Sequence, residues 1–190
     1  KFLKLENFLL SSDTSIILDR YSDFICQVNG SNKTALKCPD HMMFLPDIVK
    51  TFPESKIIWI HRDPLDSITS YCPMIESVWN LFFGGENKSS VGDFIVDLYS
   101  RMLRKTISDR DTLNLDIIDV SFKDLISSRR SLAENLSKEI KLPLVEKGPD
   151  KKPAKFFKNK YKFNRDEYGV SNDIVDRELD FYKTEYSKYL

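Results

Sequence analysis

The chain has 190 residues, which is enough for one compact domain. Hydrophobic residues make up 41% and aromatic residues 12%, so an ordered core is expected, and the 31% of charged residues is typical of soluble proteins. Lys and Arg number 29, as do Asp and Glu, and this zero formal charge argues against a nucleic-acid-binding surface. The apolar runs are shorter than the roughly 20 residues of a membrane span, so we expect no membrane span here.

The first third of the chain predicts two helices with a short strand between them. Helical periodicity over residues 14–28 predicts a helix with Asp13 as its N-cap. Residues 34–37 are a strand candidate, and residues 42–52 predict a second helix that ends before Pro53. The apolar residues of the first helix fall on one face: Ile16, Ile17, Tyr21, Phe24, Ile25 and Val28.

Residues 56–61 (Lys-Ile-Ile-Trp-Ile-His) form the clearest strand pattern in the sequence. Their apolar residues are consecutive rather than alternating, which predicts a strand of a parallel sheet that is buried on both faces. Asp63 suits an N-cap and Pro64 suits the first turn, so we expect a helix to begin directly after this strand.

The remaining elements continue the alternation of strands and helices. The pattern predicts a helix over 91–107, a strand over 115–122, a helix over 125–140, an exposed Lys-rich loop over 146–160 and an amphipathic helix over 172–189. This order favours an α/β fold with a parallel sheet flanked by helices. Because no linker interrupts the pattern, we expect residues 1–190 to form a single domain.

A candidate phosphate site lies where the strand over 56–61 ends. In open α/β sheets ligands bind beyond the carboxyl ends of the strands. Arg62 offers a fork of donors at such a place, and Ser70 follows eight residues later, about two helical turns on. Both side chains can then reach one phosphate near the helix N-terminus. The alternative is an ion pair between Arg62 and a nearby acid, with Ser70 facing no ligand.

Residues 59–70, read as a strand, His-Arg-Asp-Pro and a serine eight residues after the arginine, resemble the 3′-phosphate-binding motif of sulfotransferases that use 3′-phosphoadenylyl sulfate (PAPS). Residues 36–41 resemble the LK-x-P-x-H segment of the bacterial-type family. Residues 119–125 and 161–182 are similar to that family's second strand end and closing segment. The resemblance implies a P-loop-kinase-like fold that is incomplete at its N-terminus, since we find no phosphosulfate-binding loop in this sequence and expect it upstream of residue 1.

The resemblance also implies an activity and a cosubstrate. A sulfuryl group would pass from PAPS to a hydroxyl or amine acceptor, with adenosine 3′,5′-bisphosphate (PAP) as product and no metal. Arg62 and Ser70 would bind the 3′-phosphate. Phe122 stands where the family often has Tyr, so its ring would pack against the nucleotide without a hydroxyl contact. The expected acceptor is a small molecule, a glycan or a peptide, and not a nucleic acid.

Two other interpretations of the resemblance stay open. The protein can be a catalytically degenerate sulfotransferase-like member that binds a nucleotide or a partner without turnover. It can also be a P-loop kinase relative, which would require a Walker lysine and a magnesium-binding acid. The sequence does not indicate the oligomeric state.

His41 and Lys37 are the candidate catalytic groups. His41 is the best candidate base because an unperturbed imidazole titrates near neutral pH. The alternatives are that it bonds local backbone at a helix start, or that a glutamate upstream of residue 1 is the base. Lys37 would leave a strand end and steady the phosphosulfate, or else lie solvated. For His61, which precedes Arg62, we expect either a core role or a role behind the site residues, rather than catalysis.

Residues 73–92 are the predicted lining of the acceptor pocket, unless their apolar side chains form core instead. The apolar candidates are Met74, Trp79, Phe82 and Phe83.

Three cysteines without CxxC spacing and only two histidines argue against a zinc site or a disulfide framework. Reduced thiols favour the cytoplasm. Four N-x-S/T sequons keep a Golgi or secretory lumen open as the alternative: Asn29, Asn32, Asn87 and Asn135.

Overall fold

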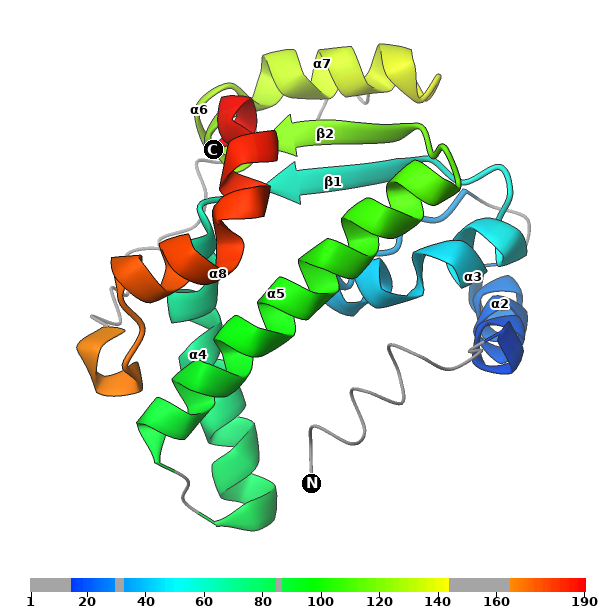
Figure 1. The fold of residues 1–190 in the computed structure, drawn as a ribbon. Helices are drawn as coiled ribbons and strands as arrows, with labels where there is room; N and C mark the ends of the chain where they lie inside the picture. The colour runs from blue at the N-terminus through cyan, green and yellow to red at the C-terminus, as the bar shows by residue number, and fades with distance from the viewer. Residues whose placement is uncertain (1–14, 30–32, 85–86, 144–164) are drawn as a thin grey trace. The chain divides into compact units, whose positions relative to one another are not determined.

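The computed structural model describes most of the chain (Figure 1). The chain divides into two compact units. The described residues are 15–29, 33–84, 87–143 and 165–190. The first unit comprises 1–57 and 101–117, and the second comprises 58–100 and 118–190. The expectation of a single domain stays a prediction.

The first described element of the first unit is α2 (Ser15–Asn29), which confirms the helix predicted there. It packs on α3 (Leu45–Thr51). On the apolar face of α2, Ile17, Phe24 and Val28 are all more than half exposed among the described residues.

Two predictions for the first unit are corrected. The strand expected over 34–37 is wrong, because residues 33–38 carry no regular structure and are exposed. The single helix expected over 42–52 is instead a 3₁₀ helix η1 (Pro39–Phe44) followed by α3. Pro46 in the first turn of α3 explains the break, since proline has no backbone N–H to continue the helical hydrogen bonds.

The strands β1 (Ile57–His61) and β2 (Ile117–Ser121) form a parallel pair. They belong to the second unit, except that the first residue of each strand is assigned to the first unit. The strands are hydrogen-bonded neighbours and point the same way (Figure 1). Two helices connect them, α4 (Pro64–Phe83) and α5 (Lys88–Thr112), as parallel pairing requires. The predicted α/β class, with a parallel sheet flanked by helices, is confirmed.

Strand β1 differs from its prediction in one respect, because only one of its faces is buried. Trp59 and His61 are 7% and 0% exposed, whereas Ile58 and Ile60 on the opposite face are 39% and 47% exposed. The aromatic residues of the C-terminal helix pack on the buried face. The other face stays partly open within the described part of the chain, so burial on both faces is wrong here.

Helix α4 begins as the sequence predicts. The carboxylate of Asp63 accepts a hydrogen bond from the backbone N–H of Asp66 at 3.2 Å, and Pro64 is the first helical residue. The start of the helix is therefore fixed directly after β1.

The later helices follow the predicted order with different bounds. The expected helix over 125–140 is two helices, because Ser128 leaves helical geometry between them. The Lys-rich loop predicted over 146–160 lies outside the described residues. The last elements are α6 (Phe122–Ser127), α7 (Arg129–Glu139), η3 (Arg165–Tyr168), α8 (Asn172–Glu185) and η4 (Ser187–Tyr189).

None of the described helices has the combination of length and apolar character that would let it span a membrane.

Candidate functional site

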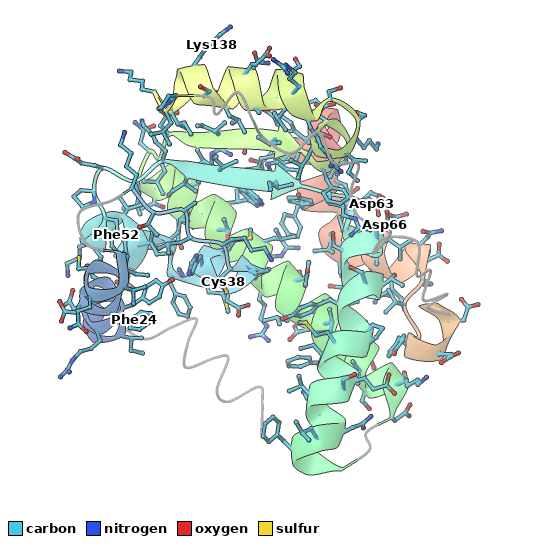
Figure 2. The ribbon with its side chains drawn as sticks, turned by 180° about the vertical axis from the view of Figure 1, so that it is seen from behind. Phe24, Cys38, Phe52, Asp63, Asp66 and Lys138 are labelled. Atoms are coloured by element: carbon cyan, nitrogen blue, oxygen red, sulfur yellow. The ribbon has the colours of Figure 1, made fainter. Side chains whose placement is uncertain are left out.

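Arg62 lies between the end of β1 and the start of α4. Its guanidinium carbon is 4.9 Å from the ring centroid of Phe122, the first residue of α6 after β2. The two strand ends thus bring a cation and an aromatic ring together, at a separation typical of cation–π contact. Figure 2 shows Asp63 and Asp66 at the same end of α4.

The donors of Arg62 are only partly used. Its Nη2 atom is 3.7 Å from Oδ2 of Asp66, which is too long for a hydrogen bond, and the two side chains are 37% and 65% exposed. An exposed ion pair of this kind contributes little to the free energy of folding. The Nε atom of Arg62 is buried and has no hydrogen-bond partner among the described residues. Within the described part of the chain, Arg62 is therefore not held by a buried acid, and one of its charged donors has no acceptor.

Ser70 is exposed on the second turn of α4. Its hydroxyl donates to the backbone carbonyl of Ser67 at 2.9 Å. Because the side chain is exposed, it can rotate to another acceptor without losing packing. The convergence of Arg62 and Ser70 on one phosphate stays a prediction.

His61 is fully buried, as a core residue that supports Arg62 should be. Its Nε2 lies 2.9 Å from Oδ1 of Asp119, and its Nδ1 lies 2.8 Å from the hydroxyl of Tyr182. Burial, with help from nearby acidic groups, raises the pKa of Tyr182, so this hydroxyl keeps its proton. Sequence reasoning did not identify these two partners. The signal for Asp119 was a single acid within the apolar strand β2.

The two catalytic candidates both belong to the first unit. Lys37 is exposed and lies in the irregular stretch rather than at a strand end, so that part of its prediction is wrong. His41 is half-buried in η1, with its backbone N–H bonded to the carbonyl of Cys38 at 3.2 Å and its ring 6.0 Å from that of Tyr21. Their catalytic roles stay predictions.

The predicted acceptor lining divides into core and surface. Trp79 is buried, with its ring 5.0 Å from that of Phe94, so it is a core residue. Met74 and Phe82 are 50% and 68% exposed on α4 and remain candidates for contact with an apolar acceptor. The side chain of Phe83 lies outside the described part. Among the described side chains, no group of three or more His, Cys, Asp or Glu could hold a metal ion.

Comparisons with known proteins bear on the family and the fold. The model of the sulfotransferase family matches residues 6–146, about three quarters of the chain. Among solved structures, the chain is similar to sulfotransferase STF9 from Mycobacterium avium, with a TM-score of 0.75 and 16% sequence identity. That match covers 95% of this chain and 49% of the mycobacterial one, so this chain spans about half the length of that protein. No curated protein matches the sequence.

Proposed function

Because the chain belongs to the sulfotransferase family, we propose that the whole protein transfers a sulfuryl group from PAPS to a hydroxyl or amine acceptor. In this proposal the residues at the ends of β1 and β2 bind the 3′-phosphate of the nucleotide. The acceptor is a small molecule, a glycan or a peptide.

The observation that carries the proposal is the guanidinium donor of Arg62, at the end of β1, that is unpaired within the described residues. Its Nε is buried and has no partner among the described residues, and its guanidinium lies over Phe122 at the start of a 20-residue helix. A phosphate that accepts two bonds from the guanidinium fork would satisfy this donor. The residues present therefore fit the 3′-phosphate of PAPS.

Three further features support a phosphate at this place. The N-terminus of α4 carries partial positive charge, which favours an anion. Ser70 can turn its hydroxyl from the carbonyl of Ser67 toward a phosphate oxygen. Phe122 supports the guanidinium from one side, so its role is first to orient Arg62 and second to pack against the nucleotide. Asp66 opposes the binding of a phosphate, since its carboxylate is also negatively charged and lies near the same guanidinium.

The reaction needs a base at the acceptor hydroxyl and cations near the leaving phosphate. PAPS supplies the sulfuryl group and leaves as PAP. We assign His41 as the base that takes the acceptor proton and Lys37 as a cation that steadies the leaving group. Lys37 is exposed and His41 is half-buried, so both side chains are accessible to a substrate.

Calorimetry with PAP and with AMP, which lacks the 3′-phosphate, tests the proposal on the full-length protein. We expect PAP to bind at least 100-fold more tightly, because two charge-assisted bonds contribute about 3 kcal/mol together. Arg62→Ala should remove most of this preference. Arg130→Ala is the matched control, since Arg130 is an exposed arginine of α7 paired with Glu134.

Equal affinity for PAP and AMP in the unmodified protein would exclude the proposed 3′-phosphate site. A clear preference for PAP without sulfuryl transfer to any acceptor would instead support the degenerate, nucleotide-binding alternative. Magnesium-dependent phosphoryl transfer would favour the kinase relative.

A further inference from the structure

His61 is the residue of β1 that directly precedes Arg62, and both ends of its ring are bonded. The Nε2 atom is 2.9 Å from Oδ1 of Asp119 in β2, and the Nδ1 atom is 2.8 Å from the hydroxyl of Tyr182 in α8. The side chain is 0% exposed. Three elements that are far apart in the sequence therefore meet at one imidazole.

The donor and acceptor roles in this chain of bonds follow from its members. With Asp119 ionised, Nε2 of His61 donates a hydrogen bond to its carboxylate, because an ionised carboxylate only accepts. In the neutral imidazole Nδ1 is then an acceptor, and the hydroxyl of Tyr182 donates to it. Both ring nitrogens are satisfied without water, and the ring cannot turn without breaking a bond.

Aromatic rings from the end of the chain hold the faces of the imidazole. The ring of Tyr186 is 4.4 Å away and inclined by 17°, and that of Tyr189 is 5.1 Å away and inclined by 18°. Figure 1 shows α8 and the C-terminus beside the arrowheads of the strands. The C-terminal segment thus packs against the strand end from which Arg62 emerges.

His61 cannot contact a substrate, because its side chain is fully buried. An effect on function therefore passes through its neighbours, of which Arg62 directly follows it in the chain. The Cα atoms of His61 and Arg62 are about 3.8 Å apart, as consecutive Cα atoms are. A change in the packing of the buried imidazole therefore acts on the backbone from which Arg62 projects, and a displacement of about 1 Å is enough to weaken a positioned hydrogen bond.

We propose that His61 is a positioning residue, which fixes the exit of β1 through Asp119 and Tyr182 so that Arg62 is presented to the 3′-phosphate. This inference rests on the proposed function and adds a role for the C-terminal helix. Tyr182 of α8 then contributes to selectivity for the 3′-phosphate through His61.

A double-mutant cycle on the full-length protein tests this role, with PAP and AMP as the two ligands. Tyr182→Phe removes one bond to His61 and keeps the ring, while His61→Phe removes both bonds and keeps an aromatic side chain. Each should weaken PAP binding about tenfold and AMP binding less than twofold. In the Arg62→Ala background, the same changes should alter PAP affinity less than twofold.

Tyr189→Phe is the matched control. It keeps the stacked ring, and its hydroxyl forms no recorded hydrogen bond within the described residues. PAP affinity should be unchanged. Thermal unfolding of every variant reports loss of stability separately from loss of selectivity. If His61→Phe does not fold, Tyr182→Phe still decides the question.

Three outcomes would overturn the inference and leave the proposed function standing. Equal weakening of PAP and AMP in Tyr182→Phe would show a general structural role. An undiminished loss of PAP affinity in the Arg62→Ala background would show that His61 does not act through Arg62. A folded Tyr182→Phe variant can also bind PAP normally while Arg62→Ala still binds it weakly. That result would exclude the positioning role alone. If Arg62→Ala itself binds PAP normally, the proposed function fails as well.

Discussion

Gly92 in α5 lies against the backbone of the segment that precedes α8. A Cβ atom built on Gly92 would be 1.9 Å from the carbonyl oxygen of Tyr168 and 3.0 Å from Cγ2 of Val170. Carbon and oxygen atoms do not approach so closely. Gly92→Ala therefore requires the Tyr168 carbonyl to move by about 1.1 Å, because contacts under 3.0 Å are essentially never seen.

The size of the effect follows from what that movement disturbs. Tyr168 is only 4% exposed, and its hydroxyl donates to the Glu76 carboxylate at 2.5 Å. Overpacking costs about 1–3 kcal/mol, and a weakened buried hydrogen bond adds about 1 kcal/mol. The higher helix propensity of alanine over glycine stabilises the variant by about 1 kcal/mol. We expect a net loss of about 2 kcal/mol, which lowers Tm by about 4–8 °C in a chain of this length.

Thermal and urea unfolding of Gly92→Ala measure this loss. Ser108→Ala is the control, since Ser108 is an exposed small residue within the same helix, where alanine should be neutral or slightly stabilising. The reasoning would be refuted if Gly92→Ala were as stable as the control. That result would mean that α5 and the Tyr168 segment do not pack as described.

Three further predictions concern the start of α4 and the cysteines. Asp63→Ala removes the N-cap and should lower Tm by about 2–4 °C, whereas Asp63→Asn should retain stability; equal losses would contradict the capping role. Asp66→Asn removes the carboxylate nearest the guanidinium and should strengthen PAP binding two- to threefold, and weaker binding would contradict this competition. Burial raises the pKa of Cys72 to about 11, so at pH 8 only about one thiol in 1,000 is ionised. Iodoacetamide should therefore modify the exposed Cys26 and Cys38 first, as peptide mass spectrometry will show, and equally rapid modification of Cys72 in the folded protein would refute its burial.

The sequence predicted the elements that have strong local signals. Consecutive apolar residues identified β1, and the Asp63-Pro64 pair located the start of α4, since both signals depend only on neighbouring residues. The family resemblance was also sound. The strand pattern, before any resemblance, placed Arg62 at a strand exit, where the structure has it.

The wrong predictions concern features that tertiary contacts determine. Residues 34–37 have strand-like composition but no neighbouring strand in the described chain, and a strand needs a partner for its backbone groups. Periodicity could not show that one face of β1 stays open, because burial depends on which elements are present to cover it. Nor could it reveal the bonds of His61, whose partners lie 58 and 121 residues away.

The most direct test of the 3′-phosphate site observes the Nε–H group of Arg62 by ¹H–¹⁵N NMR, with Arg62→Lys to assign its signal. This group has no acceptor within the described residues. On addition of PAP its proton resonance should move strongly downfield and its exchange with water should slow, while AMP should leave it nearly unchanged. An identical response to both nucleotides, or no response to PAP at saturation, would contradict the assignment of Arg62 to the 3′-phosphate.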